Sequence, residues 1–317
     1  MDKPHVVVMG SYVTDLAFRT EKLPAWGETF MGSGFQMGPG GKGSNQAVAA
    51  ARAGARVSFI SKLGCDPLGD LARKLYASEG IDATHVYSTT SATGAAAIII
   101  DAARGENAIV VVPGACFELT PDEVEHARAV IRHAAVFVAQ LELSLPTVIF
   151  GLTLAHFLGV PTILNPAPGR KLPETIFPLC DYLTPNESEA EILTGLRVAS
   201  LADAERAADA LLARGARNVI VTLGAQGALI KNASLREHVP AVDAGPVVDT
   251  TGAGDAFNGG LAVALSEGRP LVDAVKFACA VAGLSVTQPG TAPSMPQRAD
   301  VDVLLNGSSG SSSPVEF

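Results

Sequence analysis

A glycine-rich segment between residues 249 and 260, DTTGAGDAFNGG, has residue types that suit phosphoryl transfer. The sequence after it is helical in character, so Gly252 and Gly254 would let the backbone turn several N–H groups toward one point at the start of a helix. Amides in that position stabilise the charge of a transferring phosphoryl group. Asp255 would lie in the first helical turn, where it could accept a proton from a hydroxyl. The same aspartate could instead serve only to stabilise the helix dipole.

A second glycine cluster, GPGGKGSN, covers residues 38–45. Residues 38–43 match G-x-G-x-x-G, but no strong strand is expected directly before them and Pro39 is expected inside the turn, so a dinucleotide-binding loop is not supported. A Walker A loop is also excluded because Lys42 precedes the last glycine. A flexible surface turn stays open as an alternative. A helix of small residues is expected at 44–53, and its first turn would present Lys42 and Asn45 beside free amides.

The elements that must position these loops alternate between strand and helix along the chain. Such alternation predicts an α/β fold with a doubly wound, mainly parallel sheet and helices on both faces. Strands are expected at 6–10, 57–62, 135–139, 161–165, 181–184 and 218–223, and helices at 44–53, 68–79, 146–157, 187–193, 203–214, 253–266 and 271–286.

Two further sets of short, exposed strand patterns differ from the core strands. They cover about 11–36 and 95–112, the second as a hairpin, and together they are expected to form a small β-sheet lid. The core and lid together are expected to form one domain over residues 1–305. Residues 306–317 are low in complexity and are expected to be a mobile tail or a remnant of cloning.

Composition excludes several classes of function. Of 317 residues, 32 are acidic and 23 basic, which gives a net charge of −9 with no basic run, so nucleic acid is not expected as the main partner. An anionic substrate stays possible because backbone amides can bind phosphate on an acidic protein. The four cysteines are scattered and are expected to be reduced core thiols. No apolar run approaches the ~18 residues of a membrane span, so a soluble cytoplasmic protein is expected.

Together the two glycine clusters resemble the two signatures of the PfkB carbohydrate kinases, and the chain is most similar to the branch of that family that phosphorylates ribose. The resemblance runs over roughly residues 6–305. The matching motifs, which follow the family's order, cover residues 10–15, 40–47, 140–142, 165–168, 184–191, 222–224 and 249–257. The resemblance implies a three-layer α/β core, a β-lid that often serves as a homodimer contact, and ATP-dependent phosphorylation of the 5-hydroxyl of D-ribose.

The resemblance also implies roles for individual residues. Asp255 would be the catalytic base, and Gly252, Ala253 and Gly254 would form the anion hole. The sugar would be bound by residues of three segments: Val13, Thr14 and Asp15; Gly41, Lys42, Gly43, Ser44 and Asn45; and Glu142. Carboxylates and an amide can pair with several neutral hydroxyls at once, which suits a pentose. From the residues alone, Asp15 could merely stabilise a turn, and Glu142 could mark a helix entry.

For the nucleotide, the resemblance implies contacts from Asn186, Gly254, Cys279 and the glycine turn Thr222, Leu223, Gly224, Ala225, Gln226 and Gly227. Glu189 would support Mg²⁺ through water. A monovalent cation, K⁺, would be held beside the anion hole by Asp249, Thr251, Ser285, Gln288, Gly290 and Ser294, mostly through carbonyls. Three local alternatives stay open: a capping box between Asn186 and Glu189, an ordinary hairpin at 222–227, and a packing role for Cys279.

Two other functions are compatible with the same motifs. The first is a kinase of another acceptor, such as a nucleoside, fructose or a ketodeoxy sugar acid; an acidic sugar should require an arginine, and none lies in the site motifs. The second is a sugar-binding protein that has lost its chemistry, which should show a broken 252–254 loop or no Asp255.

Overall fold

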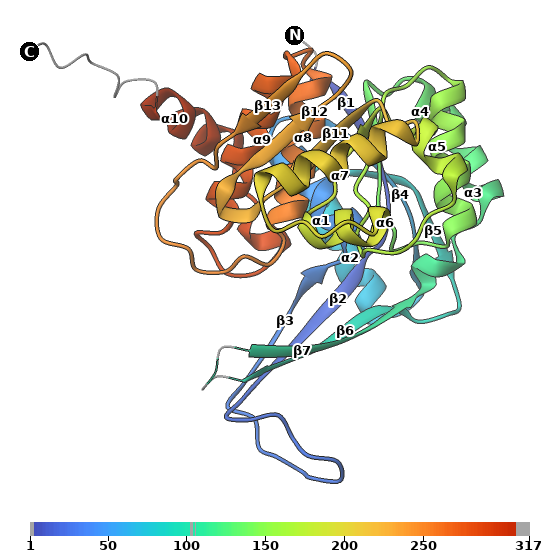
Figure 1. The fold of residues 1–317 in the computed structure, drawn as a ribbon. Helices are drawn as coiled ribbons and strands as arrows, with labels where there is room; N and C mark the ends of the chain where they lie inside the picture. The colour runs from blue at the N-terminus through green and yellow to red at the C-terminus, as the bar shows by residue number, and fades with distance from the viewer. Residues whose placement is uncertain (1–2, 102–103, 105, 309–317) are drawn as a thin grey trace, which may run out of the picture.

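The central element of the fold is a nine-stranded sheet, seen in a computed structural model that describes residues 3–101, 104 and 106–308. Its strand order is β13-β12-β11-β10-β9-β8-β1-β4-β5 (Figure 1). All neighbouring strands are parallel except the β11–β12 and β12–β13 pairs at one edge. The strands are β1 (His5–Met9), β4 (Arg56–Gly64), β5 (Asp82–Thr89), β8 (Val136–Ala139), β9 (Thr162–Leu164), β10 (Tyr182–Leu183), β11 (Asn218–Thr222), β12 (Ala228–Lys231) and β13 (Arg236–Val239).

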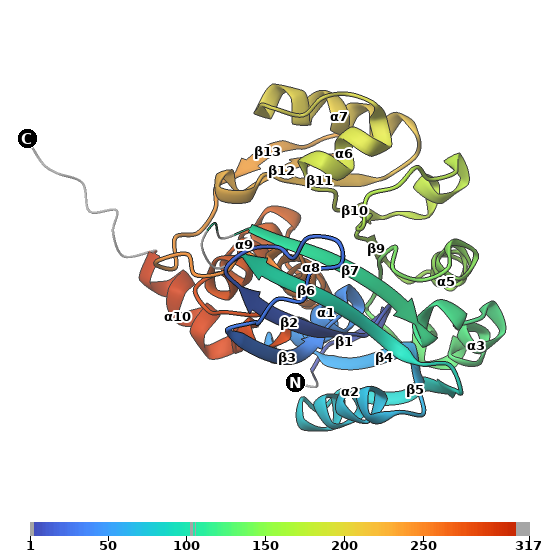
Figure 2. The same ribbon diagram turned by 90° about the horizontal axis from the view of Figure 1, so that it is seen from below.

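Helices cover both faces of this sheet, which explains why β1 is a continuous apolar run. Successive side chains of a strand point to opposite faces, so Val6 and Val8 enter one core while Val7 and Met9 enter the other. The first core is closed by α1 (Lys42–Arg52), α2 (Pro67–Ser78), α8 (Ala253–Ser266), α9 (Leu271–Ser285) and α10 (Arg298–Ser308), and the second by α3 (Pro121–His126), α4 (Arg128–Arg132), α5 (Leu145–Phe157), α6 (Glu187–Thr194) and α7 (Leu201–Ala213) (Figure 2). The expected three-layer α/β arrangement is confirmed.

A separate four-stranded sheet, with the order β3-β2-β6-β7, projects from one end of the core (Figure 1). It contains β2 (Val13–Thr20), β3 (Gly34–Gly40), β6 (Thr93–Asp101) and β7 (Glu106–Gly114). The two sets of strand patterns that are far apart in sequence are joined by the parallel pair β2–β6. A small separate sheet was expected from the sequence, but most of β3, residues 37–40, lies outside the expected range of about 11–36.

Elements with weak apolar patterns were not expected from the sequence. Strand β5 lies at a sheet edge and is only partly buried, and β13 forms the antiparallel edge on the other side. It pairs with β12, the second strand of the hairpin that the sequence left open as an alternative at 222–227. The short helices α3 and α4 were missed as well, as was α10. Residues 306–308 continue α10, whose Leu304 and Leu305 pack against the first core, and residues 309–317 lie outside the described part of the chain. No helix among the described residues is long and apolar enough to cross a membrane.

The four cysteines are all free, as expected, but only three of them are core thiols. Cys116, Cys180 and Cys279 are buried, whereas Cys65 is exposed in the turn that follows β4. The expectation of a core position was therefore wrong for Cys65, because that turn is at the surface.

Candidate active site

Asp255 is the third residue of α8 and is only 5% exposed. Its carboxylate is bound by two side chains of α1, which lies beside α8 (Figure 2). Asn45 Nδ2 donates to Oδ2 over 3.0 Å, and Gln46 Nε2 donates to Oδ1 over 2.9 Å. Gly259 allows this close approach, because a Cβ there would be 2.5 Å from the Cβ of Ala49. Both oxygens of Asp255 are thus oriented by α1, which a residue serving only the helix dipole does not require.

The start of α8 presents backbone N–H groups that have no acceptor within the described part of the chain. These are the amides of Gly252, Gly254 and Asp255, whereas the Ala253 amide donates to the Thr250 carbonyl over 3.2 Å. The positive φ of Gly252, 81°, sets the direction of this turn. The space in front of Gly254 is open, since a Cβ there would meet nothing within 4 Å. Three free amides at a helix N-terminus beside a carboxylate are able to bind an anionic group such as a phosphoryl group.

The first glycine cluster connects the small sheet directly to α1. Strand β3 runs into it, so Pro39 lies in a strand opposite Thr14 and not inside a turn, and α1 begins at Lys42, two residues earlier than expected. The flexible surface turn is therefore excluded. Gly41 has a φ of 85°, and a Cβ on Gly43 would be 2.5 Å from the Cα of Gly10. These glycines let the start of α1 lie against the loop after β1.

Polar groups of the proposed sugar site meet at the start of α1. Glu142 accepts hydrogen bonds from the Ser11 hydroxyl and from the Lys42 amide, the latter over 2.9 Å. Glu142 does not begin a helix of its own segment, since α5 starts at Leu145. Asn45 Oδ1 is buried without a partner in the described part of the chain, which leaves it able to accept a hydroxyl. These groups supply donors and acceptors of the kind that a sugar requires.

Asp15 is in strand β2 and not in a turn, so the turn-stabilising alternative was wrong. The Thr291 hydroxyl donates to the Pro39 carbonyl over 2.8 Å and lies 3.5 Å from Asp15 Oδ2. Burial raises the pKa of Asp15 to about 6; the Thr291 hydroxyl opposes this shift, and the charges of Glu142 and Asp255 add to it. Asp15 thus shares one cluster with Glu142 and Asp255.

Lys42 is the cation of this acidic cluster. Burial by itself would lower the pKa of Lys42, but the carboxylates of Asp255, Glu142 and Glu189 together raise it above its ordinary value. Lys42 therefore stays charged at neutral pH and can attract an anionic group to the free amides of α8.

The other residues expected to bind the sugar are occupied in packing. Thr14 is fully buried and its hydroxyl donates to Tyr12, and Val13 is 3% exposed. The Ser44 amide donates to the Ser11 carbonyl, and the Ser44 hydroxyl accepts from Tyr76 over 3.4 Å. These residues position the loop and α1, whereas Asp15, Lys42, Asn45 and Glu142 belong to the polar cluster around Asp255.

On the proposed nucleotide side, the capping-box alternative for Asn186 and Glu189 is confirmed. Asn186 Oδ1 accepts from the Glu189 amide over 2.8 Å, and Glu189 Oε2 accepts from the Asn186 amide over 2.9 Å. Burial raises the pKa of Glu189. Its second oxygen, Oε1, has no protein donor in the described residues, so the cap and a water-mediated contact to Mg²⁺ are compatible.

The glycine turn at 222–227 connects β11 and β12 as an antiparallel hairpin, with Gly224 and Gly227 at positive φ. A parallel bridge between Asn186 and Thr222 places this turn beside the start of α6. Ala225 and Gln226 are exposed there and accessible to a ligand. Cys279 is 6% exposed within the first core, where burial raises the pKa of its thiol to about 12. Cys279 thus has the packing role that the sequence left open as an alternative to a nucleotide contact.

Two loops proposed to hold K⁺ are joined by Asp249. Its Oδ1 accepts from the Thr251 amide over 2.9 Å, and its Oδ2 accepts from the Gly290 amide over 3.0 Å. Burial would raise the pKa of Asp249, but these amides hold it below its usual range. In the second loop the Gln288 amide donates to the Ser285 carbonyl, and the Ser294 hydroxyl donates to the Thr291 carbonyl. A charged carboxylate with neighbouring carbonyls is a donor set that fits a hard monovalent cation.

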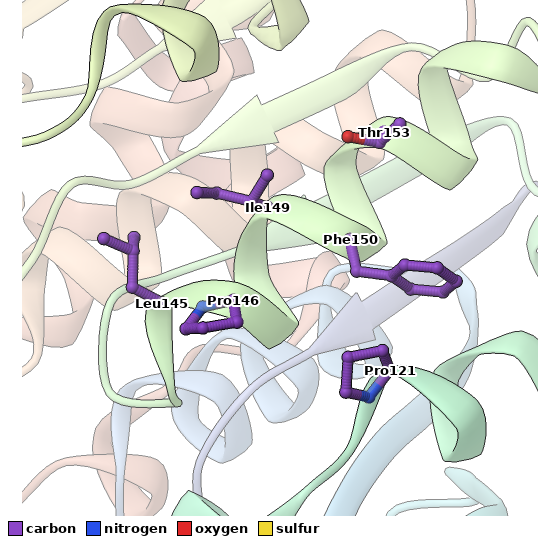
Figure 3. Close-up of a pocket in the computed structure, with 6 residues that line it drawn as sticks. All are labelled: Pro121, Leu145, Pro146, Ile149, Phe150 and Thr153. Carbon is purple, nitrogen blue, oxygen red and sulfur yellow. The ribbon is translucent and has the colours of Figure 1, made fainter.

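An apolar hollow on the outer surface lies apart from these groups, between the start of α3 and α5 (Figure 3). It is lined by Pro121, Leu145, Pro146, Ile149, Phe150 and Thr153. Since it contains no charged side chain, it has no group for proton or phosphoryl transfer.

Replacing Asp15 with Asn is expected to stabilise the fold at neutral pH. The folded-state pKa of about 6 exceeds the ordinary value of 3.8, so ionised Asp15 costs stability above pH 6 and the cost disappears below pH 4. Asp15→Asn should raise the free energy of unfolding by about 1–3 kcal/mol at pH 7.5, an advantage that shrinks toward pH 4. Denaturant unfolding at both pH values measures this.

Asp70→Asn is the matched control, because Asp70 is exposed on α2. It should show no gain that depends on pH in this way. Equal or lower stability of Asp15→Asn at pH 7.5 would contradict burial as the cause of the raised pKa of Asp15.

Four polar residues that contact this cluster, directly or through Gln46, were not predicted as site residues from the sequence. They are Gln46, Gln140, Asn165 and Thr291. The first three lie inside the motifs that match the family, so their position in those motifs could have identified them as site residues. No local pattern distinguishes Thr291, which reaches Asp15 only because its loop folds back over β3.

Residues 3–298 match the family described as pfkB family carbohydrate kinase. Among named relatives, the ribokinase of Mus musculus is 40% identical over 306 residues, covering 95% of this chain and 94% of that protein. The deoxyribokinase of Salmonella typhi is 37% identical over 292 residues, covering 92% of this chain and 95% of that protein.

A solved structure of Arabidopsis thaliana ribokinase complexed with ribose and ATP superimposes with a TM-score of 0.89. It is 32% identical in sequence, and the match covers 96% of this chain and 99% of that chain.

Proposed function

This chain belongs to the pfkB family of carbohydrate kinases, and we propose that it transfers the γ-phosphoryl group of ATP to the 5-hydroxyl of D-ribose. The products are D-ribose 5-phosphate and ADP. The observation that carries the proposal is Asp255, a buried carboxylate held by Asn45 and Gln46 beside the free amides at the start of α8. The broken loop expected of a sugar-binding protein without chemistry is not present in 252–255.

In the proposed reaction, the ribose O5–H proton moves to Asp255 while O5 forms a bond to the γ-phosphorus. The bond from that phosphorus to the oxygen it shares with the β-phosphate breaks, and its electron pair leaves with ADP. The amides of Gly252 and Gly254 would hold the charge on the transferring group. Lys42, which stays protonated, would balance part of the same charge.

Recognition of the sugar is assigned to the cluster at the start of α1. Asp15, Glu142 and Asn45 Oδ1 would accept hydrogen bonds from ribose hydroxyls, and Lys42 would donate. Val13, Thr14, Gly41, Gly43 and Ser44 would act by shaping the backbone around it. An acceptor that lacks one hydroxyl would leave a buried polar group unpaired, which reduces binding.

Two metal ions are proposed in support. Glu189 would hold Mg²⁺ through water, and Mg²⁺ supplies charge neutralisation at the phosphates when bound. K⁺ would be held by the loops that contain Asp249, Thr251, Ser285, Gln288, Gly290 and Ser294, where it would order the turn that leads into Gly252. ATP would lie along Asn186, the 222–227 turn and Gly254, with Cys279 packing near the base.

The small sheet is proposed to close over the sugar and also to join two copies of the chain. On β7, Ile109, Val110, Val111 and Val112 are each at least 50% exposed, and Phe35 of β3 is 61% exposed. Apolar side chains on a projecting sheet are expected to be buried by a partner surface. We place this homodimer in the cytoplasm, with no nucleic acid or membrane as partner.

A substrate panel tests the function directly. The purified protein is assayed by ADP production with D-ribose, 2-deoxy-D-ribose, D-fructose, adenosine and a ketodeoxy sugar acid, each with and without K⁺. D-ribose is expected to give the highest kcat/KM, with K⁺ increasing it, and ³¹P NMR should place the phosphate on the C5 oxygen.

2-Deoxy-D-ribose is the second candidate acceptor, because a deoxyribokinase relative is nearly as similar as the ribokinase relative. A higher kcat/KM for 2-deoxy-D-ribose would assign the protein to that substrate. Turnover of none of the five acceptors would rule out the proposed kinase activity.

A further inference from the structure

Three buried amide side chains form a chain that ends on Asp255. Gln46, Gln140 and Asn165 are 0%, 1% and 6% exposed. Gln46 Nε2 is 2.9 Å from Asp255 Oδ1 and 3.1 Å from Asn165 Oδ1, while Gln140 Nε2 donates to Gln46 Oε1 over 2.7 Å. None of these three amides is among the residues proposed to contact the sugar or the nucleotide.

The orientation of each amide side chain is fixed because some of its neighbours can only accept hydrogen bonds and therefore require its NH₂ group. Asn165 Nδ2 donates to the Thr184 carbonyl over 3.2 Å, so Asn165 must turn its Oδ1 toward Gln46. Asp255 as a carboxylate also only accepts. Gln46 must therefore direct its NH₂ group at both Asp255 and Asn165, which leaves its Oε1 for the Gln140 donor. One hydrogen-bond arrangement satisfies Gln46, and rotation of its amide would break three bonds at once.

The two oxygens of Asp255 consequently differ. Oδ1 faces the buried Gln46, whereas Oδ2 faces Asn45, whose own Oδ1 is buried without a partner in the described residues. A second amide oxygen, Gln140 Oε1, is also buried without a partner, but Gln140 bonds to Gln46 and not to Asp255. Asn45 bonds to Asp255 directly, so its unpartnered Oδ1 marks the Oδ2 side as the one where a ligand hydroxyl completes the hydrogen bonding.

We propose that Gln46 is a positioning residue that holds Oδ1 of Asp255, so that Oδ2 is the oxygen that receives the proton of the sugar hydroxyl. The inference rests on the proposed kinase function. Gln140 does not contact Asp255, but its hydrogen bond to Gln46 Oε1 fixes the orientation of the Gln46 amide. After proton transfer, Oδ2 carries the hydrogen and Oδ1 continues to accept from Gln46, so no amide has to rotate during the reaction.

The first test uses Gln46→Met, which keeps the volume of the side chain and removes its hydrogen bonds. With D-ribose, kcat is expected to fall about 10- to 100-fold, as for a catalytic group that is no longer held in place. The Kd of ribose should change less than about threefold, because Gln46 touches no part of the proposed sugar site. Gln140→Met should lower kcat by a smaller factor.

The second test uses Gln46→Glu, which brings a like charge beside Asp255. The other charged groups that face Asp255 are Lys42 of α1, Asp15 of β2 and Glu189 of α6, and this variant leaves all three in place. The acid limb of the kcat–pH profile should move up by about one pH unit or more, because a neighbouring carboxylate disfavours ionisation.

A purely structural role for Gln46 would lower the thermal stability and the active fraction of Gln46→Met, while the kcat of its folded fraction would stay near that of the wild type. Unchanged limbs in Gln46→Glu, or a kcat near wild type in Gln46→Met, would overturn the inference. If Gln46→Met does not fold, Gln46→Glu and Gln140→Met carry the test. Absence of ribose turnover in the wild-type protein would instead contradict the proposed function, so the two failures are distinguishable.

Discussion

Asp255→Asn is expected to lower kcat for ribose phosphorylation about 100- to 10,000-fold, the range lost when a general base is removed. An amide cannot take the O5 proton, while the amides at the start of α8 stay in place to bind the phosphoryl group. Ribose should still bind, because Asp15, Lys42 and Glu142 are unchanged. Steady-state kinetics together with calorimetric titration of ribose separates the loss of turnover from any loss of binding.

The variant should also fold, which makes the result interpretable. The new side-chain amide would place its NH₂ group against one of the two donors that now face Asp255. Asn45 can rotate its own amide and present Oδ1, since that atom has no protein partner in the described part of the chain. A melting temperature near wild type with a kcat within about threefold of wild type would show that Asp255 is not the base.

Gly43→Ala should have the second largest effect, through position and not through chemistry. A Cβ at residue 43 would be 2.5 Å from the Cα of Gly10 and 2.6 Å from the amide nitrogen of Ser11, both backbone atoms that cannot rotate away. The start of α1 must then move, and Lys42 and Asn45 move with it. We expect kcat/KM for ribose to fall about 100-fold or more, the cost of a displacement near 1 Å, together with a lower melting temperature.

Gly38→Ala in the same glycine cluster is the matched control. A Cβ at residue 38 would meet nothing within 4 Å, and β3 is extended there. Its kcat/KM and melting temperature should stay close to wild type. Equal behaviour of Gly38→Ala and Gly43→Ala would mean that the contact between α1 and the loop after β1 does not position the site.

Much of the architecture was predictable because it is encoded over short distances. Strand β1 is apolar on both faces and so had to lie inside a covered sheet. Helix α8 begins at Ala253 as expected, since two glycines and an aspartate mark its first turn. The capping box at Asn186 and Glu189 is equally local. In each case the residues that specify the element are within a few positions of one another.

The motifs also indicated which residues to consider for the chemistry, and the structure brings Asp15, Lys42, Asn45, Glu142 and Asp255 into one cluster. The sequence did not indicate that Glu142 accepts the first amide of α1. Nor did it indicate that the Ala253 amide is already bonded while its neighbours are free. These details depend on the exact turn of the backbone, which residue types alone do not specify.

By itself, then, the sequence determined the alternation of strands and helices, the two glycine loops and the candidate base. Only the tertiary structure decided that Asn45 and Gln46 hold Asp255 from more than 200 residues away, and that edge strands as polar as β5 complete the sheet. The physical reason is range. Turn, cap and periodicity preferences act over a few residues, whereas contacts between distant segments result from the packing of the whole core.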